Sequence, residues 1–154
     1  MSEIALQTAP QNMNNATVKF VTFVLGDETY AVSASFVNEV LRYTEITPVP
    51  GAPNFVLGII NLRGDVLTVI DTREVFGLSS HEVTSQSRIV VVELEDYAVG
   101  VLVDRVAAVV DLQEGSIEPS PNTGNDNAAR FIQGVYHYND ELMVLVNFAK
   151  IATL

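Results

Sequence analysis

The stretch that most constrains the fold is residues 58–71, which read GIINLRGDVLTVID. Two short apolar runs, largely β-branched, flank a polar tip at residues 61–65. Apolar runs of this kind separated by a glycine are typical of a β-hairpin. Arg63 stands beside Gly64, where the backbone is least crowded and the guanidinium can project. The stretch therefore predicts a hairpin with a cation at its tip.

A short helical turn is expected directly after the hairpin, over the sequence TREVFG at residues 72–77. Asp71 or Thr72 can cap its first turn, because short oxygen-bearing side chains accept hydrogen bonds from free backbone amides. Gly77 can end the turn, because glycine tolerates the left-handed conformation common after a helix.

The same hairpin occurs again further along the chain. Residues 134–152 align without a gap on residues 58–76, at an offset of 134 − 58 = 76. The match places Gly58 on Gly134 and also aligns an acidic position. Chance similarity between valine-rich strands is the alternative, but a gapless match that includes a glycine favours an internal duplication.

We interpret the chain as a single domain over residues 17–152, built from two copies of one small β unit. The first copy covers about residues 17–77 and the second about 87–152, with the polar residues between them as the junction. The chain is allowed to cross between the two subdomains. Residues 1–16, MSEIALQTAPQNMNNA, are expected to be a disordered lead-in.

Three further segments give local expectations. Residues 18–25 are strand-like, with apolar side chains on both faces. Residues 35–42 carry apolar side chains at i, i+1, i+4 and i+5, which predicts two helical turns with a serine as N-cap. Residues 97–110 are too long for one flat strand, so bends are expected at Gly100 and at 104–105.

The fold class follows from the number and spacing of these strands. Each copy contains about five strand signals, the turn signals recur at short intervals, and no long helix is predicted. Such a pattern indicates small antiparallel barrels, whose closure removes exposed sheet edges. We expect an all-β fold of two five-stranded barrels packed together, with a few short helices and a groove between them.

Composition limits where the chain works and what it binds. The 154 residues carry a net charge of −11, which disfavours nucleic acid and anionic lipid as partners. No run approaches the ~18 apolar residues of a membrane span, and the N-terminus does not resemble a signal peptide. A cytoplasmic protein without membrane insertion is therefore expected.

The sequence offers no catalytic or metal-binding group. Cysteine is absent, which excludes disulfides, thiol catalysis and cysteine-ligated metals. Neither His81 nor His137 has a second ligand at metal spacing, and no glycine-rich phosphate loop occurs. The VIDT sequence that ends at Thr72 resembles half of an aspartic-protease dyad, but the second copy has Asn147 where Asp71 stands. The chain is expected to be no enzyme and to use no cofactor or metal.

Taken together, these residues resemble the CheW family of chemotaxis coupling proteins. The similarity covers about residues 17–151, and its most specific part is VLGIINLRGDVLTVIDTREVFG at 56–77. VNEVLRYTEITPVPGAP at 37–53 and VGVLVDRV at 99–106 support it. The resemblance implies two five-stranded SH3-like barrels and a non-enzymatic adaptor. It also implies two partners, the cytoplasmic tips of chemoreceptors and the regulatory domain of the histidine kinase CheA.

Two departures and two alternatives accompany this resemblance. The chain stops at Leu154, where many relatives carry a longer tail, and Asn147 replaces the aspartate of the first copy. A coupling protein of another array, such as one controlling twitching pili, is a closely related alternative. A stand-alone SH3-like module that binds proline-rich peptides is a different class, but the 12 aromatic residues do not cluster in one loop pair.

The resemblance places receptor contact in the groove between the barrels, near Arg63. Glu39, on the polar face of the predicted helix, is expected to hold the guanidinium in a bidentate pair. Val37 on the same helix and Val106 at the matching place in the second copy are expected to supply apolar walls. In the alternative interpretation, Arg63 only neutralises neighbouring carboxylates.

Kinase contact is expected at the ends of the barrels, where a partner with the same duplicated fold can reproduce one pseudo-symmetric contact. The candidate residues lie in the two proline-containing connections and are Thr44, Val49, Pro50, Pro119 and Thr123. An equally simple interpretation is that the prolines merely stiffen these connections. The protein is expected to be a monomer in solution.

Overall fold

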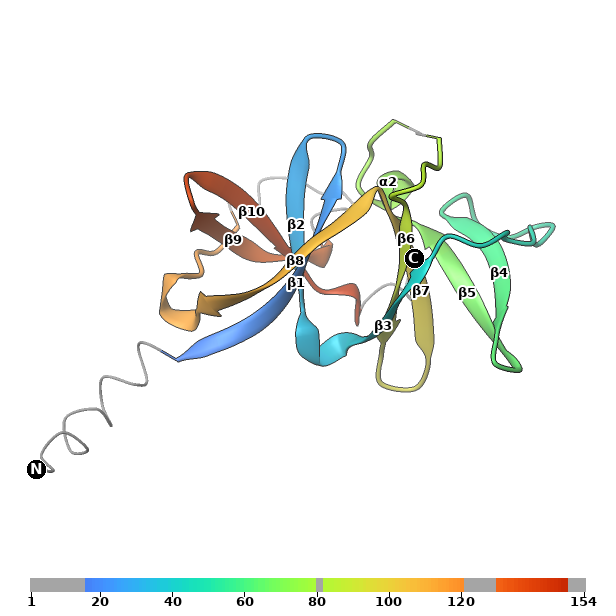
Figure 1. The fold of residues 1–154 in the computed structure, drawn as a ribbon, viewed down its shortest axis with the longest axis horizontal. Coiled ribbons are helices and arrows are strands. Elements are labelled where there is room, and N and C mark those ends of the chain that lie inside the picture. The colour runs from blue at the N-terminus through green and yellow to red at the C-terminus, as the bar shows by residue number, and fades with distance from the viewer. Residues whose placement is uncertain (1–15, 80–81, 121–129, 150–154) are drawn as a thin grey trace, which may run out of the picture.

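The structure of the chain, a computed structural model, describes residues 16–79, 82–120 and 130–149. Within these residues the fold is nearly all β, with two five-stranded sheets that lie side by side (Figure 1). The described helices are one-turn pieces, namely η1 (Ala34–Phe36), α2 (Thr72–Val75) and η2 (Glu114–Ser116). The predicted all-β fold with two five-stranded units and a few short helices is confirmed.

We call the two sheets barrel A and barrel B. Barrel A has the strand order β8 (Arg105–Gln113), β1 (Thr17–Leu25), β2 (Glu28–Ser33), β10 (Glu141–Val146) and β9 (Ile132–Tyr138). Barrel B has the order β3 (Val37–Arg42), β6 (Arg88–Glu93), β7 (Ala98–Val103), β5 (Asp65–Asp71) and β4 (Val56–Leu62). In both barrels the pairing is antiparallel except at one parallel contact, β2 with β10 and β5 with β7.

The barrels do not coincide with the two sequence copies at about 17–77 and 87–152; the chain crosses between them, which the sequence interpretation leaves open. Barrel A combines β1 and β2 of the first copy with β8, β9 and β10 of the second, and barrel B has the reciprocal composition. The chain crosses from barrel A to barrel B after β2 and returns after β7. Sequence similarity reveals the repeated unit but not its strand partners, because backbone hydrogen bonds between strands leave little trace in side-chain identity.

The repeat itself is present in the structure. An offset of 76 carries β4, Val56–Leu62, onto β9, Ile132–Tyr138. It also carries the start of β5 at Asp65 onto the start of β10 at Glu141. The predicted correspondence of the two hairpins is therefore confirmed over the residues that the structure describes.

The predicted helix over residues 35–42 is wrong. A 3₁₀ turn covers Ala34–Phe36, and the residues after it form strand β3, antiparallel to β6. Half-buried and exposed side chains alternate strictly along β3, which is the period of a strand. The apolar spacing was ambiguous over so short a segment, and pairing with β6 decided the conformation.

The predicted break in residues 97–110 is confirmed at one of its two places. β7 ends at Val103 and β8 begins at Arg105, so the chain changes barrel at Asp104. Gly100 does not bend the strand and lies buried inside β7. A Cβ added there would meet Ile89 Cγ2 at 2.7 Å, so the glycine allows close packing in barrel B.

The apolar residues on both faces of β1 are explained by the packing of the two barrels. Phe20 faces the core of barrel A, whereas Phe23 belongs to a cluster shared by both barrels, which we call the central cluster. This cluster joins Tyr30 of β2 to Val90 and Val101 of barrel B. Burial of apolar surface between the barrels makes the two sheets one cooperative unit.

Aromatic rings run through the central cluster. Phe23 stacks on Tyr30 with 5.7 Å between ring centroids, and Tyr30 stacks on Phe76 at 5.1 Å. Phe76 then meets Phe131 edge-on at 6.4 Å. Because these rings fill the space between barrels, they do not line an open groove for proline-rich peptides.

Each barrel is closed by a strap that pairs with its outer hairpin strand. Thr47 forms an isolated antiparallel bridge with Ile59 in barrel B, and Glu118 forms one with Val135 in barrel A. The straps follow β3 and β8 respectively, so each covers the edge of its own sheet.

No helix of the described residues is long and apolar enough to cross a membrane.

Candidate functional site

The arginine at the hairpin tip is held by a tight two-residue turn between β4 and β5. Arg63 and Gly64 both have positive φ angles, 52° and 90°, as a type I′ turn requires. The Asn61 side chain accepts a hydrogen bond from the Gly64 backbone amide at 3.0 Å. The equivalent turn of the second copy, Asn139 and Asp140, also has positive φ angles but no cation.

Arg63 forms the predicted bidentate ion pair with Glu39. Its Nη1 donates to Glu39 Oε1 at 3.3 Å, and its Nη2 donates to Oε2 of the same carboxylate. The pair lowers the pKa of Glu39 and raises that of Arg63, in both cases chiefly through the hydrogen bonds. Glu39 projects from strand β3 rather than from a helix, and strand pairing fixes its position.

The ion pair lies in a groove of about 360 Å³ whose lining belongs to barrel B alone, not in a groove between the barrels as the resemblance implied. The Arg63 side chain is 69% exposed, whereas that of Glu39 is 29% exposed. Val66 and Tyr97 line the groove and are exposed, and Asp65 contributes a further carboxylate. A cation held by one carboxylate beside exposed apolar side chains is suited to binding another protein. The residues that line the groove include no nucleophile with an adjacent base.

Val37 and Val106 occupy a different place from Arg63. Both are half-buried and pack against the central cluster, and neither lines the groove around the ion pair. Val37 pairs with Val92 in barrel B, and Val106 pairs with Phe23 in barrel A. The structure therefore brings Glu39 and Arg63 together and places the two valines at the edge of the packing between barrels.

The four candidate kinase-binding residues that the structure describes lie on the two straps. Thr44, Val49 and Pro50 are exposed in the connection between β3 and β4 on barrel B, and Val49 is 41% exposed. Pro119 is exposed next to the bridge that closes barrel A. Thr123 lies outside the described residues.

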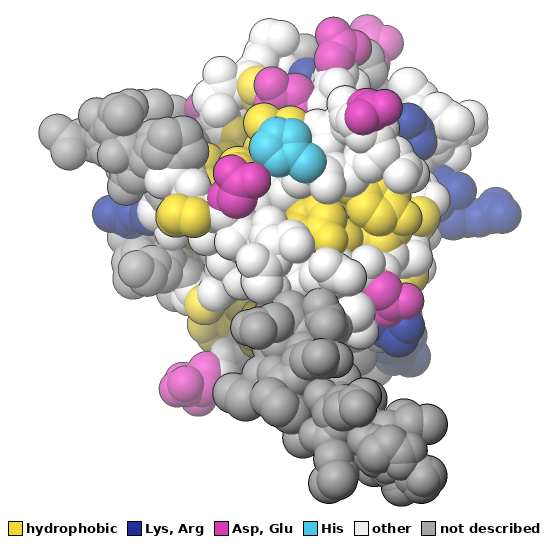
Figure 2. All heavy atoms as spheres, turned by 90° about the vertical axis from the view of Figure 1, so that its left-hand side faces the viewer, with side chains coloured by type: hydrophobic (Ala, Val, Ile, Leu, Met, Phe, Trp, Pro, Cys, Tyr) yellow, Lys and Arg dark blue, Asp and Glu magenta, His cyan; other side chains and the backbone are white. Residues whose placement is uncertain are grey.

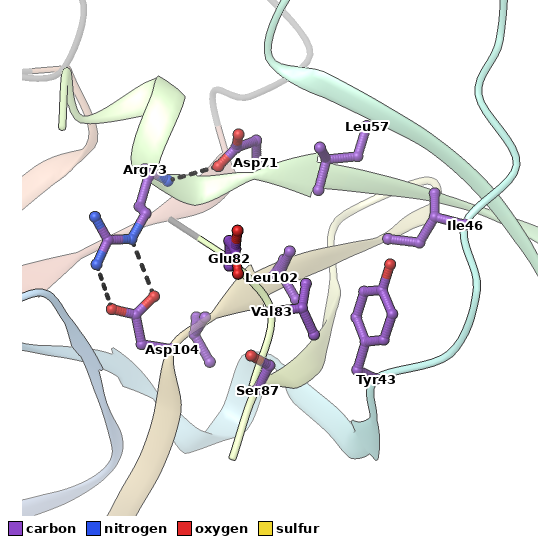
Figure 3. A pocket seen from close by; sticks show the side chains of 11 residues that line it. Tyr43, Ile46, Leu57, Asp71, Arg73, Glu82, Val83, Ser87, Leu102 and Asp104 are labelled. Atoms are coloured by element: carbon purple, nitrogen blue, oxygen red, sulfur yellow. Dashed lines mark hydrogen bonds and ion pairs between the residues drawn. The ribbon is translucent and has the colours of Figure 1, made fainter. Parts of the chain in front are cut away.

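A second ion pair, which the sequence analysis did not identify as a site, joins Arg73 to Asp104 (Figure 3). Arg73 Nε donates to Asp104 Oδ1 at 3.0 Å, and Nη2 donates to Oδ2 at 2.5 Å. The Gly26 backbone amide also donates to Asp104 Oδ2, at 2.7 Å. The Arg73 side chain is 13% exposed and that of Asp104 21%. The hydrogen bonds with Asp104 raise the pKa of Arg73.

This second pair borders a pocket of about 240 Å³ in barrel B. Figure 3 shows Tyr43, Ile46 and Leu57 on the apolar side of the pocket and the Arg73–Asp104 pair on the polar side. Of the two predicted cap residues, Asp71 caps α2 by accepting hydrogen bonds from the Arg73 and Glu74 amides, whereas Thr72 is the first residue of the helix. Arg73 and Asp104 are 31 positions apart and meet at the crossover after β7, so no local sequence signal joined them.

In the part of the chain that the structure describes, histidine and acidic residues form no recognisable metal site. No group of three or more histidine, cysteine, aspartate or glutamate side chains could hold a metal ion among the described residues. His137 is exposed, with Nδ1 3.4 Å from a carboxylate oxygen of Glu118. Figure 2 views this face, on the side of barrel A, and shows acidic and apolar side chains around the histidine. His81 lies outside the described residues.

The two barrels and their exposed surfaces indicate a general class of protein. Two SH3-like barrels share a central core, and the exposed features of the described residues are straps and a groove rather than a reaction centre. This is the organisation of a protein-binding scaffold.

Comparison with known proteins then identifies the family. The CheW-like domain model matches residues 19–154. The chain is 31% identical to the chemotaxis protein CheW of Rhizobium meliloti, over 95% of this chain and 94% of the relative. It is 33% identical to the chemotaxis protein CheW of Helicobacter pylori, over 92% and 85% respectively. The crystal structure of the scaffolding protein TtCheW from Thermoanaerobacter tengcongensis superposes with a TM-score of 0.82 at 34% identity, covering 89% of this chain and 93% of that one. The chain belongs to the CheW-like domain family.

Proposed function

We propose that this protein is a non-enzymatic coupling adaptor of chemotaxis, which bridges the cytoplasmic tips of chemoreceptors to the histidine kinase CheA. Membership of the CheW-like family and similarity to a scaffolding protein support this proposal. The observation that carries it is the Arg63–Glu39 pair, held at a hairpin tip inside a groove with exposed apolar side chains. Such a site can bind a second protein without performing a reaction.

The receptor is proposed to dock in the groove around Arg63. A receptor tip is a helical hairpin, and helices bind grooves by inserting apolar anchors. Val66, which is 67% exposed, and Tyr97, which is 43% exposed, offer apolar contacts beside the cation. Glu39 orients the guanidinium, so that its remaining donors can meet carboxylates or carbonyl oxygens of the partner. Val37 and Val106 are proposed to extend this surface towards barrel A.

The kinase is proposed to bind the straps that close the barrels. The two straps make equivalent bridges, at Thr47 in barrel B and Glu118 in barrel A. A partner built from the same barrels can therefore form one kind of contact with either end. We expect Val49→Asp to weaken kinase binding while the circular dichroism spectrum stays native, because the valine is exposed and a charge disfavours an apolar contact. Unaltered affinity would remove this strap from the interface.

The experiment that tests receptor binding is charge reversal of Arg63. Arg63→Glu places two acidic side chains together and removes the cation, so we expect loss of receptor-dependent kinase activation in reconstituted arrays. Arg63→Lys should be partly defective, because lysine cannot make the planar bidentate pair. A control is Lys19→Glu, which breaks the pair with Asp111 on barrel A; the Lys19 side chain is 67% exposed, close to the 69% of Arg63.

The outcomes separate a binding role from a purely local electrostatic one. If Arg63 only neutralises carboxylates, Arg63→Glu will lower the melting temperature slightly and leave kinase activation intact. If the proposal is correct, Arg63→Glu will stay folded and lose activation, and Lys19→Glu will retain it. A folded Arg63→Glu variant with full activation would refute the receptor site.

A further inference from the structure

We infer that Arg73, Asp104 and the Gly26 amide form a clasp that sets the orientation of barrel A relative to barrel B, and that Arg73 and Asp104 are positioning residues for coupling. This inference rests on the proposed function, because orientation matters only if partners are held at both barrels. The three groups come from α2, from the crossover between β7 and β8, and from the turn between β1 and β2.

The carboxylate of Asp104 joins elements of both barrels. Arg73 follows β5 of barrel B and donates two hydrogen bonds to it, and Gly26 of barrel A donates a third. The Asp104 amide in turn donates to the Val24 carbonyl of β1 at 3.1 Å. Arg73 Nη1 also donates to the Ser79 carbonyl at 2.8 Å, which holds the guanidinium from the opposite side. Rotation of one barrel against the other would therefore break directional hydrogen bonds.

The apolar packing between the barrels does not supply this direction by itself. Hydrophobic burial is roughly proportional to area and non-directional, so it favours contact without selecting one angle. A planar bidentate pair, by contrast, adds geometric specificity to its energy. The Arg73 side chain is 13% exposed, which protects the pair from solvent screening.

The clasp is not a simple product of the internal duplication. The offset of 76 that aligns the hairpins places Arg73 on 73 + 76 = 149, which is Ala149. The cap before it is retained, because Asn147 Oδ1 accepts a hydrogen bond from the Ala149 amide at 2.8 Å, as Asp71 Oδ1 does from Arg73 at 3.1 Å. The cation therefore follows only the first of the two equivalent hairpins. The contact that it makes between the barrels has no counterpart after the second hairpin at Ala149.

The clasp is also connected to the proposed receptor groove through one strand. β5 begins at Asp65, which lines the groove, and ends at Asp71, which caps the helix that carries Arg73. β5 is hydrogen-bonded on both sides, to β4 and to β7. The position of a partner in the groove is therefore linked to barrel A through β5 and the clasp.

The test measures the distance between the barrels directly. The chain contains no cysteine, so Glu95→Cys on barrel B and Glu114→Cys on barrel A provide two exposed spin-label sites. Double electron–electron resonance should give a narrow distribution of the distance between the two spin labels in the parent double-cysteine protein. Arg73→Gln should broaden or shift it, and Arg73→Lys should partly restore it. The control Lys19→Met removes an exposed pair within barrel A and should change nothing.

A functional readout separates orientation from mere stability. Arg73→Gln should leave binding of a receptor fragment to the groove within about twofold but reduce receptor-dependent kinase activation about tenfold, because two-site engagement depends on geometry and is worth about 10²–10⁴ in avidity. If Arg73→Gln does not fold, Asp104→Asn is the milder variant, since it keeps the shape and one carbonyl acceptor. A folded variant with an unchanged distance distribution overturns the clasp. Absence of coupling in the parent protein would instead refute the proposed function, and the distance measurement would still decide the clasp.

Discussion

Replacing Gly58 by alanine should open barrel B. A Cβ at this position would overlap the carbonyl group of Thr47 and lie 2.9 Å from Ile46 Cγ2, so the strap must move away. Two backbone hydrogen bonds, both 2.9 Å long, would be lost between Thr47 and Ile59. Each is worth about 1 kcal/mol. The positive φ of 151° at Gly58 adds strain of about 1–2 kcal/mol for alanine. The expected loss in the free energy of unfolding is therefore about 3–4 kcal/mol.

Chemical denaturation of matched glycine variants isolates the steric part of this loss. Gly134→Ala meets the Glu118 carbonyl oxygen at 2.6 Å and should cost about 2 kcal/mol, because the equivalent strap of barrel A loses the same two bonds. Gly77→Ala has a φ of 74° but no neighbouring atom within 4 Å, so only strain of about 1–2 kcal/mol is expected. If Gly58→Ala costs no more than Gly77→Ala, the strap does not close the barrel as described.

Three further predictions concern single side chains. Thr72→Val should raise the unfolding free energy by about 1 kcal/mol in urea denaturation, because the buried Thr72 hydroxyl has no hydrogen-bond partner among the described residues; a loss of stability would contradict this. Burial raises the pKa of Tyr30 above its ordinary value of ~10, so stability should fall as the pH rises above that value, and Tyr30→Phe should flatten a melting-temperature profile between pH 8 and 11. The hydrogen bonds from Arg63 lower the pKa of Glu39, so the stabilising effect of its charge is present above the ordinary glutamate pKa of ~4.3 and lost as the pH falls through the lowered one. Wild type and Glu39→Gln should therefore differ near pH 6 and converge in acid, and a constant difference would contradict the role of the pair.

Local features were predictable from the sequence because they depend on neighbouring residues. The β-branched runs and a glycine were enough to predict the hairpin around Arg63. The position of Asp71 directly before a helix was enough to predict its role as a cap. The repeat at an offset of 76 was visible because both copies keep a glycine at the same place. Gly58 and Gly134 each face a strap that leaves no room for a side chain. Nearby residues thus determined the turns, the cap and the repeated unit.

The pairing of distant residues depended on the fold as a whole. The segment after Phe36 became strand β3 because β6 lay beside it, although its apolar spacing also suited a helix. Each copy is divided between the two barrels, because the chain changes barrel after β2 and again at Asp104. Backbone hydrogen bonds and apolar burial between strands choose these partners, and both are summed over the whole molecule.

The two ion pairs show the same division within the functional surface. The sequence placed Arg63 at a hairpin tip and suggested Glu39 as its partner, because that carboxylate lies on the polar face of the segment expected to be a helix. Nothing in the sequence joined Arg73 to Asp104, which are separated by 31 positions and meet through the crossover between the barrels. Side-chain chemistry therefore determined what each residue can bind, whereas the exchange of strands between the two copies determined which residues meet.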